Sequence, residues 1–412
     1  MASQDQLRTA DKVDIIAEEL SSLVIHPDED AVTKLAKVAR TPSAGFGVFA
    51  TQDIPKGALI AVESAVLAIP QVPDEQAAIE FCKALHQISK ANLDRLQSLS
   101  LDPLAWKSVS ADNVRSRIWQ WCEDNIATNQ GGQRKSHHEL SSLVDHTCRC
   151  YGIFLTNNLE TGSDSGRGVY PFFSRMNHSC RPDIYEYFDT KTKELSLRAI
   201  HDIKAGDQIH STYVDLLQPR KKRQKTLEAW GFTCQCSACT NPAFDALGER
   251  AVELDDMLEE YLFYHDDFSS DTDDDHEPFL KGPDEALGVA QELIQLLKDQ
   301  GLYGEALYHT YVVTDCLPCS LGHVSRPLTT NTQRSYWSAS KLGIEVDDLE
   351  LALGYAREAR EIEVCCVGPD RRLSEDDTIE WISYLESQIA HAKEGGSLTA
   401  KVAHQEYDPS SP

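Results

Sequence analysis

Three cysteines lie within six residues in the middle of the chain, Cys234, Cys236 and Cys239, with the spacing Cys-x-Cys-x-x-Cys. Thiolates at this spacing can wrap a tight turn around a tetrahedral zinc ion. A closed structural zinc site needs a fourth ligand, and Cys180 is the candidate from elsewhere in the chain. The alternative is a group of unrelated buried thiols. The spacing favours a four-cysteine structural zinc site.

Cys180 also belongs to a second polar stretch, residues 177–182, which reads Asn-His-Ser-Cys-Arg-Pro and follows an apolar run. Buried asparagine and histidine side chains must find hydrogen-bond partners, either in the protein or on a ligand. For Asn177 and His178 taken singly, partners within the protein are the commoner outcome. The whole string Asn-His-Ser-Cys-x-Pro is long and rare, and it favours a ligand site.

Two further stretches contain residues suited to a binding site. Gly45 and Gly47 flank Phe46, and two such glycines let a backbone press closely against a ligand, although the pattern also occurs in plain turns. Residues 203–215 predict a turn followed by a strand that ends at Tyr213. A tyrosine at that position is ordinarily a core residue whose hydroxyl is hydrogen-bonded.

Length and composition limit the possible classes of protein. A chain of 412 residues predicts two to three domains, and its net charge of -27 repels nucleic-acid phosphate. The same charge attracts basic polypeptides, including lysine-rich tails, or serves solubility alone. No signal peptide or membrane-spanning run is evident, so we expect an intracellular protein of the nucleus, the cytoplasm or both. Its cysteines are then expected to be free thiols or metal ligands.

Hydrophobic periodicity predicts an ordered series of segments along the chain. Residues 253–277 contain twelve Asp or Glu and no Lys or Arg, which is typical of a solvated linker. Short strands are expected at 151–155, 184–188, 195–199 and 208–212. The predicted segments are an N-terminal helical extension at 1–37, a β-rich domain at 38–215 with a helical insertion at 74–150, a cysteine segment at 216–242, an acidic linker at 243–282, and a tetratricopeptide-like helical domain at 283–412.

Three smaller motifs have both a functional and a structural interpretation. The basic string at 219–225 resembles a nuclear-localisation signal, or it is a solvated helix face. Cys316 and Cys319, near His309 and His323, could bind metal or undergo redox chemistry, or belong to a helical core. The cluster at 146–150, His-x-Cys-x-Cys, has the same two interpretations.

Four motifs of this sequence occur in the order that they have in SET-domain proteins. They are Gly-x-Gly, Asn-His-Ser-Cys-x-Pro, Gly-Asp-Gln-Ile…Tyr and Cys-x-Cys-x-x-Cys. Residues 213–239 resemble more narrowly the SET and MYND group and its fungal relatives. The resemblance covers about residues 38–240, and the helical C-terminal half is similar to the tetratricopeptide-like domain of that group. Two departures stand out: no MYND zinc-finger spacing is present, and Asp183 replaces the usual asparagine after Asn-His-Ser-Cys-x-Pro.

The resemblance implies an α+β fold: a β-rich SET fold with a helical insertion and a threaded C-terminal segment, a zinc-binding post-SET segment, and an all-α C-terminal domain. It implies an S-adenosylmethionine-dependent protein-lysine methyltransferase that acts on a histone or another protein. The alternative is a catalytically inactive SET scaffold that binds peptides through its helical C-terminal domain.

The resemblance also assigns roles to individual residues and classes of partner. Tyr213 would be the catalytic residue and would contact the cofactor, and Phe232 would line the cofactor or lysine channel. The zinc ligands would be Cys180, Cys234, Cys236 and Cys239. The other cofactor-binding residues would be Gly45, Phe46, Gly47, Asn157 (or its neighbour Asn158), Asn177 and His178. The expected partner is a protein with an accessible lysine, a basic tail being one candidate, without direct nucleic-acid or membrane binding, and the expected state is a monomer.

Overall fold

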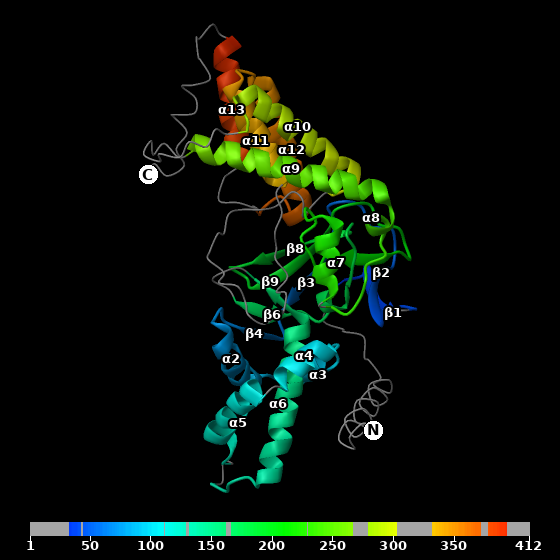
Figure 1. The fold of residues 1–412 in the computed structure, drawn as a ribbon, viewed down its shortest axis with the longest axis vertical. Helices are drawn as coiled ribbons and strands as arrows, with labels where there is room; N and C mark the ends of the chain where they lie inside the picture. Colours follow the sequence, from blue (N-terminus) through cyan, green and yellow to red (C-terminus); the bar gives the residue numbers. More distant parts are fainter. Residues whose placement is uncertain are drawn as a thin grey trace.

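The computed structural model describes residues 33–42, 44–110, 112–128, 132–161, 166–228, 230–266, 279–302, 332–371 and 378–393. The structure is elongated, with a group of helices at each end and the strands between them (Figure 1). Most of the predicted N-terminal extension lies outside the described residues, as do Cys316, Cys319, His309 and His323. Residues 303–331 of the predicted tetratricopeptide-like domain also lie outside them.

The central region consists of short strands in three sheets. The first sheet has the order β1-β2-β10-β7, with β10 parallel to β7, and brings together the glycine motif, the Asn-His motif and the strand before Tyr213. Its strands are β1 (Ala36–Arg40), β2 (Phe46–Ala50), β7 (Asn177–His178) and β10 (Gln208–Ser211). The end of the predicted helical extension, residues 36–37, is therefore strand, because β1 pairs along its length with β2.

The other two sheets have the orders β3-β9-β8 and β4-β6-β5. Val48, Ile60 and Leu197 are buried in one apolar core beneath the strands, where alternate side chains point inward. The strands expected near 184–188, 195–199 and 208–212 are present. The remaining strands are β3 (Leu59–Ser64), β4 (Leu67–Ile69), β5 (Asn158–Glu160), β6 (Arg167–Val169), β8 (Ile184–Asp189) and β9 (Glu194–Ala199), with a short 3-10 turn η1 (Phe173–Arg175).

The helical insertion forms one end of the molecule, around a core of its own (Figure 1). The strand predicted over 151–155 is wrong, because these residues continue helix α6 through Asn157. Their side chains are nearly all buried, and a short apolar run does not distinguish a buried strand from a buried helix. The helices are α2 (Asp74–Gln87), α3 (Lys90–Gln97), α4 (Pro103–Val109), α5 (Asp112–Ile126) and α6 (His137–Asn157).

The other end of the molecule is all helical, as expected for the C-terminal region. The linker predicted over 243–282 is wrong for residues 243–266, which form the single helix α9 (Pro242–Asp266). Ala251, Leu254, Leu258 and Tyr261 recur at helical spacing and are buried, while the acidic residues of this segment lie between them. The other C-terminal helices are α10 (Pro283–Gln300), α11 (Thr332–Glu345), α12 (Leu349–Val367) and α13 (Thr378–Lys393).

The C-terminal helices pack on the central sheet through the end of α12. The Cys365 thiol lies 3.5 Å from the carbonyl oxygen of Ala199, and Arg371 pairs with Asp189 across 3.3 Å. Two short helices, α7 (Arg220–Glu228) and α8 (Ser237–Thr240), lie within the predicted cysteine segment, and α8 packs on α9 (Figure 1). Within the described ranges, no helix combines the length and apolar character that a membrane crossing requires.

Candidate functional site

The glycine motif and the Asn-His motif meet across the first sheet. The Asn177 side chain donates to the carbonyl oxygen of Phe46 across 3.0 Å. Gly45 has φ +69°, a left-handed conformation that favours glycine. A Cβ on Gly47 would lie 2.7 Å from the Gln208 side chain and 3.1 Å from that of Asn177. Gly47 is thus required for the backbone to approach Asn177 closely, and Gly45 is favoured by the left-handed turn that precedes it.

His178 connects two other parts of the site. Its Nδ1 lies 3.0 Å from the backbone nitrogen of Tyr213, and its Nε2 lies 3.3 Å from the Cys180 sulfur. Because the Tyr213 N–H can only donate, Nδ1 must accept, and in the neutral ring Nε2 then carries the proton. This tautomer is assigned from the hydrogen-bond network. Its Nε2–H points to the Cys180 sulfur.

Tyr213 lies among aromatic rings next to His178. Its ring centroid is 4.9 Å from that of Trp230, 5.4 Å from that of His178 and 6.4 Å from that of Phe232. The Tyr213 hydroxyl donates to the carbonyl oxygen of Met176 across 2.7 Å. Among the described residues, the buried indole N–H of Trp230 and the buried hydroxyl of Ser211 find no hydrogen-bond partner. Such orphaned groups fit a pocket that a ligand or water completes.

The four predicted zinc ligands converge on one point. The sulfurs of Cys180, Cys234, Cys236 and Cys239 all lie within 4.8 Å of one another, and those of Cys180 and Cys239 are 3.5 Å apart. Zinc–sulfur bonds of about 2.3 Å place the corners of a tetrahedron roughly 3.8 Å apart, so the cluster has the right size. Hydrogen bonding from the other three sulfurs raises the pKa of the Cys180 thiol far above its ordinary value. Four thiolates at this separation repel one another strongly unless a cation lies between them, and zinc fits this donor set.

The segment that contains these motifs matches a known protein family. Residues 45–214 match the family model of the SET domain. The chain carries a SET domain. It is 31% identical over 147 residues to histone-lysine N-methyltransferase set5 of Schizosaccharomyces pombe, a match that covers 35% of this chain and 44% of that protein. It is 33% identical over 108 residues to human N-lysine methyltransferase SMYD2, covering 26% of this chain and 24% of that protein.

The matched segments span less than half the length of either relative. Among solved structures, the SET domain of LSMT bound to lysine and AdoHcy is 15% identical with a TM-score of 0.30, covering 95% of this chain and 86% of that one. That score is too low to establish a shared fold. The assignment of a SET domain rests on the sequence match and on the motifs.

Asn157 lies at the end of α6, at the edge of the SET-domain site. Its side-chain amide donates to the carbonyl oxygens of Ile153 and Ser100, each across 2.7 Å. Its own carbonyl accepts a hydrogen bond from the Ser174 hydroxyl across 3.2 Å, which ties it to the segment before Asn177. Asn158 instead donates back into α6, to Phe154 across 3.0 Å. Asn157 is therefore bonded to the segment before Asn177, and the Asn158 side chain to α6.

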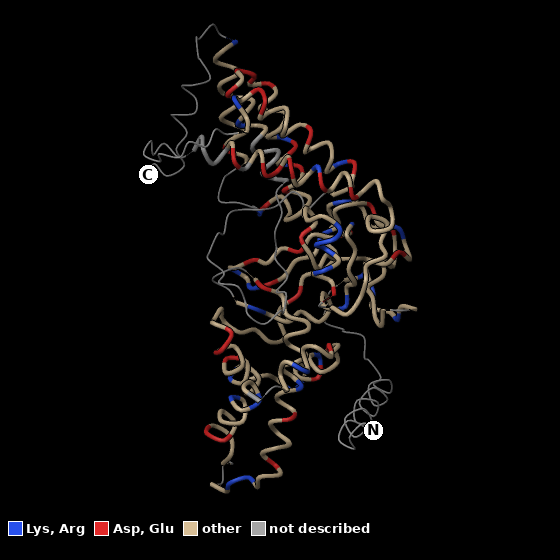
Figure 2. The backbone as a smooth tube through the Cα atoms, in the orientation of Figure 1, with Lys and Arg blue, Asp and Glu red and all other residues tan. Residues whose placement is uncertain are grey.

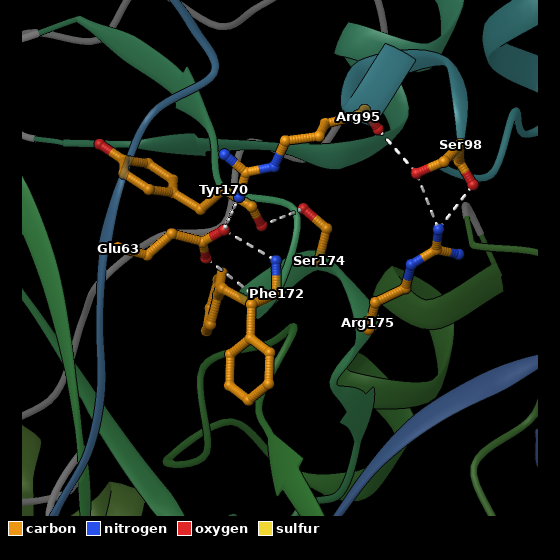
Figure 3. A network of polar contacts seen from close by, with 8 residues as sticks. Glu63, Arg95, Ser98, Tyr170, Phe172, Ser174 and Arg175 are labelled. Carbon is orange, nitrogen blue, oxygen red and sulfur yellow. Dashed lines mark hydrogen bonds and ion pairs between the residues drawn. The ribbon is translucent and has the colours of Figure 1, made fainter. Parts of the chain in front are cut away.

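Two arginines flank Phe46, and neither was among the predicted site residues. The guanidinium carbons of Arg40 and Arg175 lie 5.1 Å and 5.0 Å from the centre of its ring. Arg175 is buried and donates to the carbonyl oxygen and hydroxyl of Ser98 across 2.6 Å and 3.1 Å (Figure 3). The position of Arg175 two residues before Asn177 was the available sequence signal.

A second network lies beside Arg175 and holds the loop before the Asn-His motif. The buried carboxylate of Glu63 accepts from the backbone N–H groups of Phe172 and Phe173 across 2.9 Å and 3.1 Å (Figure 3). Arg95 pairs with the same carboxylate across 3.5 Å. This network fixes the entry to β7.

Asp183, which stands where the related proteins usually have an asparagine, has a hydrogen-bond partner nearby. Its carboxylate accepts from the backbone nitrogen of His210 and lies next to the His210 ring nitrogen Nδ1, at 2.9 Å in each case. Asp183 N–H in turn donates to the His210 carbonyl oxygen across 2.9 Å. Aspartate in place of the usual asparagine is therefore accommodated, because His210 on β10 faces it.

Trp230, like Arg40 and Arg175, was not among the predicted site residues, although it begins the Trp-Gly-Phe-Thr-Cys string.

Proposed function

We propose that the protein is an S-adenosylmethionine-dependent protein-lysine N-methyltransferase. The proposal rests on one juxtaposition: the glycine turn bonded to Asn177 adjoins a cluster of aromatic rings around Tyr213, with His178 between them. A cofactor at the glycine turn and an amine at the aromatic cluster would lie next to each other. Such alignment of two reactants supplies much of the rate enhancement in a transfer reaction.

The glycine turn suits the methionine end of the cofactor. Arg40 and Arg175 bring two positive charges to Phe46, and these would pair with the cofactor carboxylate. A Cβ on Gly45 would meet nothing within 4 Å, so the turn leaves room for a ligand beside this glycine. When bound there, S-adenosylmethionine supplies a methyl group on a positively charged sulfur.

The aromatic cluster suits a lysine side chain. A lysine amine in water has a pKa near 10.4, so about one in a thousand is neutral at pH 7. Burial among Tyr213, Trp230 and Phe232, beside a positive sulfur, disfavours the ammonium form and lowers that pKa. The neutral nitrogen then forms a bond to the methyl carbon while the carbon–sulfur bond breaks and its electron pair stays on sulfur. The Tyr213 hydroxyl orients the amine, and no separate general base is required.

The metal site is part of the proposal as a structural element. Cys180, Cys234, Cys236 and Cys239 would hold one zinc ion, and four thiolates leave no open position for catalytic water. The cluster joins the segment that leads into Cys234 to Cys180, two residues after His178. It thereby holds Trp230 and Phe232 over Tyr213.

The charge of the chain suggests the class of substrate. Acidic residues recur along α9–α13, and basic residues are concentrated on α7 (Figure 2). A net charge of -27 favours a lysine-bearing protein with a basic segment over nucleic acid. The S. pombe relative is named a histone-lysine and the human relative an N-lysine methyltransferase. We propose a histone or non-histone protein substrate, action as a monomer, and a location in the nucleus, the cytoplasm or both.

A scaffold that has lost catalysis and binds peptides through α9–α13 is the alternative. The placement of Asn177, His178 and Tyr213 around one pocket favours the enzyme. Calorimetry with S-adenosylmethionine, followed by transfer of a tritiated methyl group to proteins of a cell lysate and mass-spectrometric site mapping, separates the two. We expect binding and labelled lysine with the wild type, and binding without labelling for Tyr213→Phe. Binding without transfer by the wild type would support the scaffold, and absence of both would refute the proposal.

A further inference from the structure

The basic string at 219–225 has a buried member. It forms the start of α7, where Arg220, Lys221, Lys222 and Lys225 are exposed or half-buried. Arg223 differs from them, with 5% of its surface exposed. A buried guanidinium is costly unless it is paired and hydrogen-bonded. The partner of Arg223 must therefore lie inside the protein.

Ordinary partners account for only part of the Arg223 side chain. Its Nη1 donates to the carbonyl oxygen of Gln218 across 2.6 Å, while its buried Nε has no partner among the described residues. The nearby carboxylate of Asp215 is engaged with its own turn, accepting from Leu217 N–H across 2.9 Å and from Gln218 across 3.2 Å. Within the described part of the chain, this buried positive charge thus forms no ion pair with a carboxylate.

The cysteine cluster lies beside this charge. Leu227, one turn beyond Arg223 on the same face of α7, is fully buried in the apolar core that contains Cys180, Cys234 and Cys239, so the buried Arg223 side chain is on the face of α7 that packs on the cluster. Four thiolates around one zinc ion carry a net charge of about −2, and the ligands enclose the metal from water. A buried negative cluster of this kind needs a positive neighbour as much as the guanidinium needs a negative one.

We propose that Arg223 is the counter-charge of the four-cysteine zinc site, and that α7 belongs to this site as its outer shell. This inference rests on the zinc site of the proposed function and assigns it a positioning residue. The next residue of the helix supports the same role for α7. Gln224 donates to the Cys234 carbonyl oxygen across 3.0 Å and accepts from the Cys234 N–H across 3.1 Å.

Cys180 then has neighbours from two parts of the chain. His178 places Nε2 3.3 Å from its sulfur on the cofactor side, and the buried face of α7, with Arg223 and Leu227, packs on the cluster. Donors to a ligating thiolate fix its orientation and disperse its charge. The basic string is consequently not a uniform surface feature: Arg223 faces inward to the cluster, while Lys221, Lys222 and Lys225 remain exposed.

The test measures zinc directly on the full chain, by competition with a chromophoric chelator and by metal analysis. Outer-shell substitutions typically weaken metal binding about 10- to 100-fold, and we expect a loss of this size for Arg223→Gln. Arg223→Lys should retain most of the affinity because it keeps the charge. Lys222→Gln is the matched control, since it removes the same charge from an exposed position on the same helix and should leave zinc affinity unchanged.

A second variant keeps the inference testable if Arg223→Gln does not fold. Cys236→His replaces a half-buried thiolate by a neutral ligand, which reduces the negative charge of the cluster by one. The loss of zinc affinity caused by Arg223→Gln should therefore be markedly smaller in the Cys236→His background. The double variant should fold. Equal zinc affinity of the wild type and Arg223→Gln, or an undiminished loss in the Cys236→His background, would overturn the role of Arg223. A wild type that binds no zinc would overturn the zinc site itself, and methyl transfer is assayed separately.

Discussion

The SET-domain site and the helical insertion are held together in different ways. In the site, Asn177 reaches Phe46 across 131 positions of sequence, Cys180 reaches Cys239 across 59, and His178 reaches Tyr213 across 35. In the insertion, helices satisfy their own backbone, and α6 begins with a capping box in which Ser136 and Glu139 bond reciprocally. One region depends on a few distant contacts, whereas the other depends on local structure and apolar burial.

This difference predicts different responses to a single substitution. A helix in the insertion retains most of its hydrogen bonds when one side chain is truncated, so the cost is a cavity. The site loses its geometry when one polar group or one sulfur is removed, because no repeated contact replaces it. The two regions should therefore separate experimentally into stability effects and functional effects.

The largest effect is expected for Cys236→Ser. One zinc per chain in the wild type should be lost, because three thiolates no longer close the tetrahedron. Cofactor binding and methyl transfer should disappear with the metal, while the helical content falls little. Metal analysis with circular dichroism checks this. Full zinc content in the variant would show that the cluster does not hold the ion.

The next effect is expected for Tyr213→Phe. The ring stays, but the hydroxyl that lies 2.7 Å from the Met176 carbonyl oxygen is gone. Loss of a positioned hydrogen-bonding group at a reacting centre typically lowers turnover about 100-fold or more. Zinc content and calorimetric cofactor binding should be unchanged. Unimpaired turnover in a tritium-transfer assay would remove Tyr213 from the chemistry.

A contrasting result is expected for Phe81→Ala in the insertion. Phe81 is fully buried, and its ring lies 5.0 Å from that of Tyr151 and 5.3 Å from that of Phe154. The cavity should lower the free energy of unfolding by about 3–5 kcal/mol, measured in urea. Zinc content should stay at the wild-type level in the folded protein. Zinc loss before unfolding would contradict the independence of the two regions.

The smallest effect is expected where the C-terminal helices meet the sheet. Burial raises the pKa of Asp189, but the Thr192 and Lys191 N–H groups and the charge of Arg371 outweigh it, so the pKa lies below its ordinary value of 3.8. The lowered pKa stabilises the fold above about pH 3.8, and this contribution is lost as the pH falls further. Arg371→Gln should cost less than about 1 kcal/mol. Urea unfolding should give the same cost at pH 7 and pH 5.5, and a cost that vanishes at pH 5.5 would argue against this pair.

The same contrast explains what could be predicted from the sequence. Motifs of rare residue types located the SET domain and the four cysteines, because their spacing constrains the chemistry that they can perform. Periodicity located the helices but misassigned residues 151–155, where burial on all sides hides the helical pattern. Composition misassigned α9, because its acidic residues concealed the helical spacing of Leu254 and Leu258.

Other features required coordinates. Nothing in the spacing of the basic string distinguishes Arg223 from Lys222, since only tertiary packing turns one inward and leaves the other exposed. Arg40 and Phe46 lie close in sequence, but the approach of Arg175, which is distant in sequence, to the same ring follows from the fold. Such contacts depend on segments far apart in the chain, and local patterns do not encode them.

The central claim is that distant segments form one cofactor site and that the cysteine cluster holds them in place. Calorimetric titration of S-adenosylmethionine into the zinc-loaded chain, and into the same chain after chelation, tests it most directly. We predict one cofactor bound per zinc-loaded chain, and no measurable binding after chelation with helicity nearly preserved. Absence of binding to the loaded chain, or binding unaffected by chelation, would contradict the claim.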